Sequence, residues 1–212
     1  MQKINYGKML EAKLGELSEK GERPTLLLHA CCAPCSSYVL EYLSDIFKIT
    51  LFYYNPNIFP KQEYDKRYDE LRRLVSDMGL CDVEFADAEY EPEVYFELVK
   101  GLEALPERSE RCKLCYAQRL EQTAKVASLG GFDYFTTTLS ISPYKNADWL
   151  CEIGGEMAER YGLGYLYSDF KKRGGYKRSI ELSEKYGLYR QDFCGCVFSK
   201  RDRNAKSSTG ER

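Results

Sequence analysis

Short apolar runs alternate along the chain with longer amphipathic segments. Residues 25–30 ("TLLLHA") and 48–55 ("KITLFYYN") are typical of buried strands, and residues 132–146 predict a further strand that runs into a loop. Residues 61–79 and 110–131 carry apolar positions at helical spacing. Because strands and helices alternate, the pattern predicts an α/β fold in which a parallel sheet has helices on both faces.

The chain of 212 residues is long enough for one domain with short appendages. We expect an N-terminal helical extension at 1–24, a single α/β domain at 25–200, and a polar, flexible tail at 201–212. In sheets of this kind, ligands bind beyond the carboxyl ends of the strands. Cys31 and Cys32 follow the first predicted strand, so we expect metal-binding cysteines at the C-terminal edge of the sheet.

The net charge of −2 excludes a globally basic nucleic-acid binder, although it leaves room for a local basic groove. No apolar run approaches the roughly 20 residues that span a bilayer. The charged N-terminal segment lacks the apolar core of a signal peptide. We therefore expect a cytoplasmic protein without a membrane partner.

The nine cysteines need an explanation of their own, because structural disulfides are rare in a reducing compartment. Cys81 and Cys151 stand alone in the sequence and are expected to be small buried residues. The other seven fall into three tight groups, which are Cys31, Cys32 and Cys35; Cys112 and Cys115; and Cys194 and Cys196. Thiolates in such groups bind zinc, copper(I) or iron–sulfur clusters, or exchange electrons.

The segments "CAPC" and "CKLC" fit a four-cysteine zinc site, and a zinc-stabilised RNA-binding module is the alternative that this pattern leaves open. Two features argue against it. The "CC" doublet exceeds what a closed tetrahedral site needs, and "CGC" is too cramped for an ordinary half-site. A disulfide between Cys194 and Cys196 would close a small, strained ring, which is typical of labile, catalytic disulfides. Gly195 gives the backbone the freedom to close it.

Five segments in register, "LLLHACCAPCS", "YYNPNIFPKQEYDKR", "RCKLCYAQRL", "TTTLSISPYKN" and "DFCGCVFS", resemble the QueH epoxyqueuosine reductase family. The resemblance spans roughly residues 25–200. It implies a fold similar to the HUP (adenine nucleotide α-hydrolase) group. It also implies an iron–sulfur enzyme that reduces the epoxide of epoxyqueuosine at the tRNA wobble position to queuosine.

By the same resemblance, a [4Fe-4S] cluster is expected on the doublet and the Cys-x-x-Cys pair, which are Cys31, Cys32, Cys112 and Cys115. Cys194 and Cys196 resemble the family's redox-active disulfide. Cys35 is a candidate ligand of an additional mononuclear iron. Asp192, beside the dithiol, is a candidate proton carrier or iron ligand, with a solvated turn residue as the alternative. The electron donor is not identified by the sequence.

Polar and aromatic residues at the same sheet edge are candidates for substrate binding: His29, Tyr54, Asn55, Asn57, Ser140, Ser142, Lys145 and Asn146. Tyr54 and Phe59 are candidate platforms for splayed-out bases. For His29 a buried polar role is an equal alternative, and the asparagines are equally suited to cap turns. A basic loop is a candidate for phosphate contacts with tRNA: Lys171, Lys172, Arg173, Lys177 and Arg178.

A third hypothesis is an ATP-dependent tRNA sulfur-transfer enzyme, since related HUP folds activate tRNA with ATP. Such enzymes carry a glycine-rich phosphate loop after the first strand. The chain has "CCAPC" there, without a run of glycines whose backbone N–H groups would bind pyrophosphate. The ATP-dependent hypothesis is therefore disfavoured.

Overall fold

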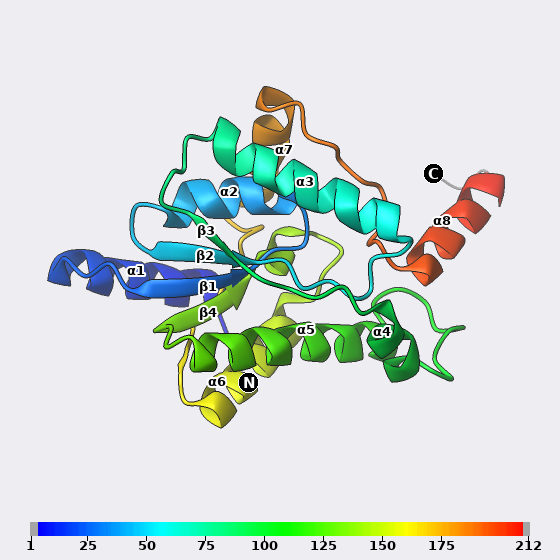
Figure 1. The fold of residues 1–212 in the computed structure, drawn as a ribbon, viewed down its shortest axis with the longest axis horizontal. Coiled ribbons are helices and arrows are strands. Elements are labelled where there is room, and N and C mark those ends of the chain that lie inside the picture. Colours follow the sequence, from blue (N-terminus) through cyan, green and yellow to red (C-terminus); the bar gives the residue numbers. More distant parts are fainter. Residues whose placement is uncertain (1–3, 210–212) are drawn as a thin grey trace.

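The computed structural model describes residues 4–209, with the backbone alone described from 206 onward. Its centre is a five-stranded parallel sheet of order β3-β2-β1-β4-β5 (Figure 1). The strands are β1 (Thr25–His29), β2 (Lys48–Phe52), β3 (Glu84–Ala86), β4 (Tyr134–Thr137) and β5 (Gly164–Tyr165). This order places β1 in the middle of the sheet, where both of its edges are paired, with β2 on one side and β4 on the other.

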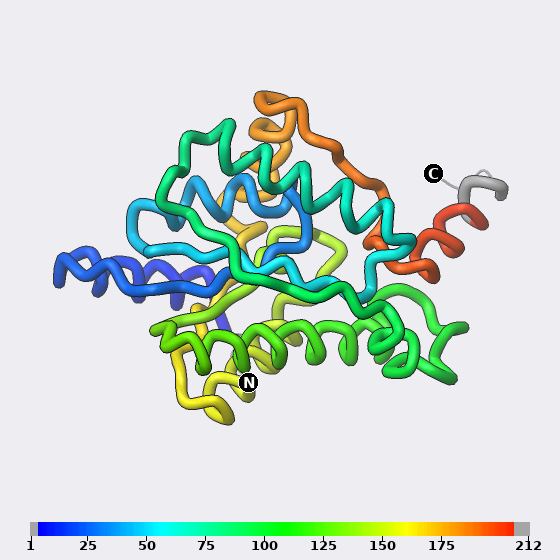
Figure 2. The backbone as a smooth tube through the Cα atoms, in the orientation of Figure 1, coloured from blue at the N-terminus to red at the C-terminus, as the bar shows by residue number. Residues whose placement is uncertain are grey.

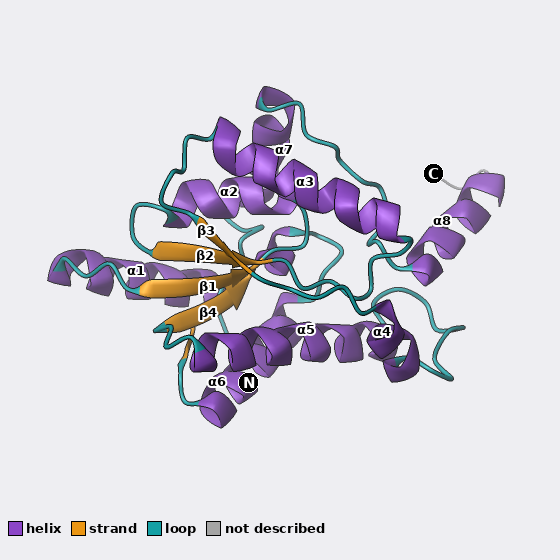
Figure 3. Cartoon of the chain, in the orientation of Figure 1, coloured by secondary structure: helices purple, strands orange, loops and turns teal. Residues whose placement is uncertain are grey.

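Helices cover both faces of the sheet, with α2, α3 and α7 on one side and α5 and α6 on the other (Figure 3). Their bounds are α1 (Tyr6–Lys20), α2 (Ala33–Leu43), α3 (Lys61–Asp77), α4 (Pro92–Leu98), α5 (Glu110–Leu129), α6 (Ala147–Tyr161), α7 (Gly175–Lys185) and α8 (Val197–Thr209), with a 3₁₀ turn, η1 (Thr138–Ile141). The predicted α/β fold with a parallel sheet is confirmed.

The side chains of β1 divide the core into two layers. Leu26 and Leu28 are fully buried among residues of α2 and α3, while Leu27 is fully buried among residues of α5 and α6. Alternate residues of a strand face opposite sides of a sheet, so a strand covered on both faces is continuously apolar. This is why three leucines follow one another within "TLLLH", with no polar residue between them.

Several sequence-based expectations differ from the structure. Residues 201–209 of the predicted polar tail belong to helix α8, and residues 210–212 lie outside the described residues. Cys81 is exposed, so its predicted burial is wrong, whereas the predicted burial of Cys151 is confirmed. Within residues 4–209, none of the helices is both long enough and apolar enough to span a membrane.

The expected N-terminal extension packs into the main core. Leu10, Leu14 and Leu17 of α1 are buried in the same cluster as the α2 face of β1. At the other end of the chain, the segment after α7 runs back along α3 to α8 (Figure 2). This return brings the third cysteine group to the C-terminal edge of the sheet, where Phe59 N–H donates to the Gly195 carbonyl at 3.0 Å.

Candidate active site

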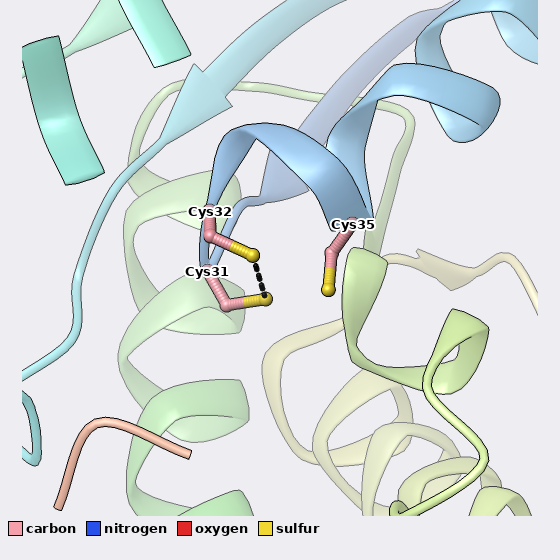
Figure 4. Close-up of side chains that lie close together, drawn as sticks. All are labelled: Cys31, Cys32 and Cys35. Atoms are coloured by element: carbon pink, nitrogen blue, oxygen red, sulfur yellow. Dashed lines mark hydrogen bonds between the residues drawn. The ribbon is translucent and has the colours of Figure 1, made fainter. Parts of the chain in front are cut away.

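Three cysteines converge where β1 passes into α2 (Figure 4). Cys31 and Cys32 lie between the two elements, and Cys35 stands on the first turn of α2. Their Sγ atoms all lie within 4.8 Å of one another, and those of Cys31 and Cys32 are 3.7 Å apart. Thr138 Oγ1 accepts the Cys31 backbone N–H at 3.3 Å and lies 3.6 Å from the Cys31 sulfur. Three thiols this close form a donor set for a soft metal.

The three thiols differ in pKa because they form hydrogen bonds with one another. Hydrogen bonds from Cys31 and Cys35 hold the pKa of Cys32 well below its ordinary value, despite burial. The hydrogen bond with Cys32 raises the pKa of Cys31 to about 11, and hydrogen bonds with both neighbours raise the pKa of Cys35. Cys32 is therefore the thiol of this group that ionises first.

The other two cysteine groups lie next to this triad. Cys112, on the first turn of α5, packs in the same cluster as Cys31, while Cys115 packs with Cys196. The Cys-x-x-Cys pair therefore lies between the doublet and the CGC pair. Within the described part of the chain, Cys31, Cys32 and Cys35 are the one group whose sulfurs lie close enough to share a single ion, and Cys112 and Cys115 stand outside it. None of the nine cysteines, those of the CGC pair included, forms a disulfide in this structure.

The CGC turn is held from three sides. Gly195 has φ +112°, a backbone conformation that L side chains rarely adopt, and its carbonyl accepts the Phe59 N–H. Arg67 Nη1, from α3, donates to the Cys194 carbonyl at 3.2 Å. The Cys194 N–H donates to Ser199 Oγ at 3.1 Å. These contacts fix the position of the dithiol relative to the sheet edge.

Four buried cations surround the cysteines. Arg67 forms an ion pair with Glu63 at 2.7 Å, and Lys145 forms one with Glu107 at 3.0 Å. The other two are Arg111 and Arg119, each 1% exposed.

The two buried arginines of α5 have no carboxylate partner among the described residues. Arg111 Nη1 lies 3.5 Å from the Cys196 sulfur, and Arg119 Nε donates to the Cys115 carbonyl at 3.2 Å. One donor on each guanidinium, Arg111 Nε and Arg119 Nη2, has no hydrogen-bond partner in the described part of the chain. Because a buried, uncompensated cation costs several kcal/mol, these arginines favour an anion in the space between the cysteine groups.

Among the described side chains, the cation closest to a thiol is Lys145. Its side chain is 7% exposed, and its Nζ lies 3.1 Å from the Cys194 sulfur. The pKa of Cys194 lies well below its ordinary value, because of the hydrogen bond from Cys196 and then because of the charges of Lys145 and Arg119. The same hydrogen bond, together with burial, raises the pKa of Cys196. The two sulfurs of the CGC pair are therefore electrostatically unequal.

Comparison with known proteins agrees with this geometry. Residues 26–202 match the family model described as "Epoxyqueuosine reductase QueH". The chain belongs to the QueH family. Among its relatives, the QueH of Streptococcus pyogenes is 43% identical over 93% of this chain and 79% of its own length. The QueH of Staphylococcus epidermidis is 44% identical over 93% and 85%, respectively, and that of Thermotoga maritima is 37% identical over 86% and 93%.

The fold also resembles a solved structure outside the QueH family. The U34-tRNA thiolase NcsA from Methanococcus maripaludis, solved with its [4Fe-4S] cluster, superposes with a TM-score of 0.51 at 12% sequence identity. The superposition covers 95% of this chain and 73% of NcsA. At this identity the likeness concerns the fold alone.

His29 is fully buried, as expected if it is a buried polar group of the core and not a substrate-binding residue. Its Nε2 lies 3.0 Å from the Tyr54 carbonyl, which can only accept, so Nε2 carries the proton and Nδ1 accepts from the Thr137 hydroxyl at 2.8 Å. Burial, and then the charge of Arg119, lowers the pKa of His29 to about 4. The geometry favours a neutral, fully bonded core group in this QueH-family member.

The candidates after β2 are buried as well. Tyr54 stacks on Phe52 with ring centroids 5.8 Å apart, so its ring belongs to the core, whereas Phe59 is 39% exposed. Asn55 Nδ2 donates to the Ala30 carbonyl at 2.8 Å. Asn57 is 1% exposed, and its amide nitrogen and oxygen find no partner among the described residues. Asn57 is thus the candidate whose side chain remains available to a ligand.

The candidates after β4 have mixed roles. Asn146 caps α6 by accepting the backbone N–H groups of Asp148 and Trp149, as the capping alternative predicts. Ser140 is buried at 3.4 Å from Ser168 Oγ. Ser142 is half-buried, and its hydroxyl accepts the N–H of the exposed Tyr144. The structure thus brings Ser142 near the surface and keeps Ser140 inside.

Asp192 has a solvent-exposed side chain. Its side chain is 60% exposed and pairs with Arg203 at 2.8 Å, which corresponds to the solvated alternative. The predicted basic loop ends at α7, which contains Lys177 and Arg178. Lys171 pairs with Asp169 at 2.7 Å, Arg173 with Glu11, and Arg178 with Glu41 at 2.8 Å. Lys172 and Lys177 are exposed. Three of the five basic residues are thus already paired with carboxylates within the chain.

Sequence reasoning missed the buried arginines and Glu107. One signal was present: Arg111, Cys115 and Arg119 are spaced four residues apart, which places them on one face of α5. Arg67 lies inside "YYNPNIFPKQEYDKR", a segment that carries the family resemblance. Glu107 carried no signal, because its partner Lys145 is 38 residues away in the sequence.

Proposed function

We propose that this protein is an epoxyqueuosine reductase, which removes the epoxide oxygen of epoxyqueuosine in tRNA and leaves queuosine. The observation that carries the proposal is the match to the QueH family over residues 26–202, which includes all three cysteine groups. The fold supports it by bringing these groups to one edge of the sheet. An enzyme that binds an iron–sulfur cluster needs several thiolates close together, whereas a packing role for the cysteines does not require this.

The chemistry of the site fits an iron–sulfur cluster. Cys31, Cys32, Cys112 and Cys115 are the proposed ligands of a [4Fe-4S] cluster, which when bound supplies one-electron transfer. A cluster with four thiolate ligands is anionic, and it would compensate the unpaired guanidinium groups of α5. Cys35, whose sulfur lies within 4.8 Å of those of Cys31 and Cys32, is the proposed ligand of an additional mononuclear iron.

The CGC dithiol is proposed to store electrons, and polar and aromatic residues near it are proposed to bind the substrate. The dithiol of Cys194 and Cys196 is proposed to become a disulfide when it gives up two electrons. Asn57, with its unpaired amide, is the proposed contact to the modified base, and Ser142 is a second polar contact. The exposed ring of Phe59 is a proposed stacking platform for a neighbouring base.

The proposed macromolecular substrate is tRNA with epoxyqueuosine at the wobble position. Lys172, before α7, and Lys177, on its first turn, are exposed lysines that are proposed to contact its phosphates. Such contacts predict that tRNA binding weakens as salt is added. Asp192 is the proposed proton carrier, because its exposed carboxylate lies two residues before Cys194 in the sequence.

Expression in a bacterial strain that lacks its own reductase tests the proposed function. Such a strain accumulates epoxyqueuosine in its tRNA, and this protein is expected to convert it to queuosine in the nucleoside digest. Cys194→Ser is expected to abolish the conversion, and Cys81→Ser, which changes an exposed cysteine outside the three groups, is expected to leave it intact.

The alternative of a zinc-stabilised RNA-binding module makes a different prediction about metal content. It requires about one zinc per chain, no acid-labile sulfide, and no absorbance near 400 nm after anaerobic purification. A protein with that composition, and with epoxyqueuosine unchanged in the complementation strain, would contradict the reductase proposal.

A further inference from the structure

Arg119 is a buried cation beside the proposed cluster ligands. It lies on α5, one turn after Cys115, and its side chain is 1% exposed. Its Nε donates to the Cys115 carbonyl at 3.2 Å, and its Nη1 lies 3.5 Å from Asn55 Oδ1. Its Nη2 has no hydrogen-bond partner among the side chains and backbone groups that the structure describes. Because a buried cation without a counter-ion is unfavourable, the guanidinium favours an anion on the side of this free donor.

Asn55 extends the contacts of Arg119 to the cysteine doublet. Asn55 is fully buried, and its Nδ2 donates to the Ala30 carbonyl at 2.8 Å. Ala30 directly precedes Cys31 in the sequence. The path of polar contacts therefore begins at Cys115 and ends beside Cys31, so it joins the Cys-x-x-Cys pair to the doublet. A planar guanidinium holds its acceptors in a fixed geometry, which makes arginine suited to link two ligand pairs.

The other buried cations of the site have different contacts. All three of them reach the CGC pair: Arg67 through the Cys194 carbonyl, Lys145 through the Cys194 sulfur and Arg111 through the Cys196 sulfur. Two of them, Arg67 and Lys145, are also paired with carboxylates. Among these four cations, Arg119 is thus the one whose contacts lie between the proposed ligands of the cluster.

We propose that Arg119 is a positioning residue for the iron–sulfur cluster, which holds the two pairs of cluster ligands together and raises the reduction potential of the cluster by its charge. The proposal rests on the iron–sulfur cluster of the proposed function, and it does not depend on which substrate the enzyme reduces. It gives the fork of Arg119 and the charge of Arg119 two separate effects.

The effect of the charge follows from the electron balance. Reduction by dithionite adds one electron to the cluster, and in this step no bond forms or breaks and no proton moves. The reduced state therefore carries one more negative charge than the oxidised state. A buried cation stabilises the more negative state to a greater extent, so Arg119 shifts the equilibrium towards the reduced cluster.

A reductive titration of the anaerobic holoprotein with dithionite and redox dyes tests the charge. The visible absorbance and the electron paramagnetic resonance signal of the cluster give the ratio of reduced to oxidised protein. Arg119→Met is expected to lower this ratio at a fixed potential at least about tenfold, which is a shift of about 59 mV for a one-electron couple. Arg119→Gln is a second neutral variant with the same expected result. Arg119→Lys keeps the charge, so its ratio is expected to stay within about threefold of wild type.

The rate at which a chelator removes iron from the oxidised holoprotein tests the fork. Residues that orient metal ligands typically contribute tenfold or more to metal retention, so Arg119→Met and Arg119→Lys are both expected to release iron about tenfold faster than wild type. Arg160→Met is the matched control, because it removes a 62% exposed arginine near the end of α6 that pairs with Glu121. It is expected to change neither the potential nor the rate of iron release.

Two results would overturn the proposal. One is a wild-type potential in a neutral variant of Arg119 that carries its full iron and sulfide. The other is iron release at the wild-type rate from both Arg119→Met and Arg119→Lys. If the Arg119 variants do not retain a cluster, Asn55→Leu decides, because it keeps the charge and cuts the path to Ala30. Faster iron release at a wild-type potential would then support the proposal, and wild-type iron release would overturn it.

These experiments separate the role of Arg119 from the reductase function. The expected shift in potential, without any reduction of epoxyqueuosine, would leave Arg119 in its role and refute the reductase function. Reduction of epoxyqueuosine, with an unshifted potential in the neutral variants, would do the reverse. Wild-type protein without iron and sulfide would overturn the role of Arg119 together with the cluster.

Discussion

Gly195→Ala is the most informative single change at the dithiol, because it leaves both sulfurs and all four cations in the chain. Gly195 has φ +112°, and a Cβ atom built on it would lie 2.9 Å from Ile58 Cγ1 and 3.1 Å from Arg67 Nη1. Ile58 is 1% exposed and cannot move aside freely. Alanine at this position is therefore strained in its backbone and crowded by its neighbours.

The expected magnitude has two parts. A non-glycine residue in such a backbone conformation costs about 1–3 kcal/mol. Forcing a methyl group into a packed site costs about 1–3 kcal/mol more. We expect a total of about 3 kcal/mol, which corresponds to roughly two powers of ten in the equilibrium between the held and displaced CGC turn. The displaced turn loses the hydrogen bonds from Phe59 and Arg67 that fix the dithiol.

Gly187→Ala provides the matched control, since its φ is +57° and nothing lies within 4 Å of the added Cβ. It is expected to cost about 1 kcal/mol, from the backbone alone. Urea unfolding of the anaerobic proteins measures both costs, and epoxyqueuosine reduction measures their functional effect. We expect only Gly195→Ala to lose most of its activity. Equal unfolding free energies and equal turnover in the two variants would refute the argument that this turn is held in one conformation.

Three further predictions concern other parts of the molecule. Gly154→Ala places a Cβ 2.2 Å from the ring of Tyr165 and is expected to lower the unfolding free energy by about 1–3 kcal/mol. The Cβ of Gly15→Ala meets nothing within 4 Å, so this change is expected to raise the unfolding free energy by up to about 1 kcal/mol. Urea unfolding that gives changes of the same sign for both variants would count against the packing argument. Hydrogen bonds from the first residue of β1 lower the pKa of Asp133 below its ordinary 3.8, so its stabilising effect is present above that pH and disappears as the pH falls through the lower folded-state value. Asp133→Asn is thus expected to cost about 1 kcal/mol near pH 7 and almost nothing near pH 2, and a cost that does not vary with pH in urea titrations would contradict this. Cys35→Ser is expected to lower the iron content by about one atom per chain while leaving acid-labile sulfide unchanged; a loss of sulfide would make Cys35 a cluster ligand instead.

The parts of the site that follow from local sequence were predictable. β1 is a continuous apolar run because it is covered on both faces, and its carboxyl end fixes the place of Cys31 and Cys32. The helical spacing of "CKLC" places Cys112 and Cys115 on the first turns of α5. Hydrophobic period and the alternation of strands with helices were sufficient for these conclusions.

The charges around the cysteines were not predictable in the same way. Lys145 was expected to contact the substrate at the rim, yet it is buried against Cys194, which is 49 residues away in the sequence. Tyr54 was expected to be open to a base, yet the core closes over it because Phe52 stacks on its ring. Such contacts depend on how elements pack, and periodicity within one element carries no information about them.

The central claim is tested most directly by incubating the anaerobically purified protein with tRNA that contains epoxyqueuosine and a chemical reductant, and then measuring the mass of the modified nucleoside. The account predicts that epoxyqueuosine loses one oxygen atom and becomes queuosine, and that Cys194→Ser does not perform this conversion. A nucleoside of unchanged mass, from protein that carries its full complement of iron and sulfide, would contradict the account.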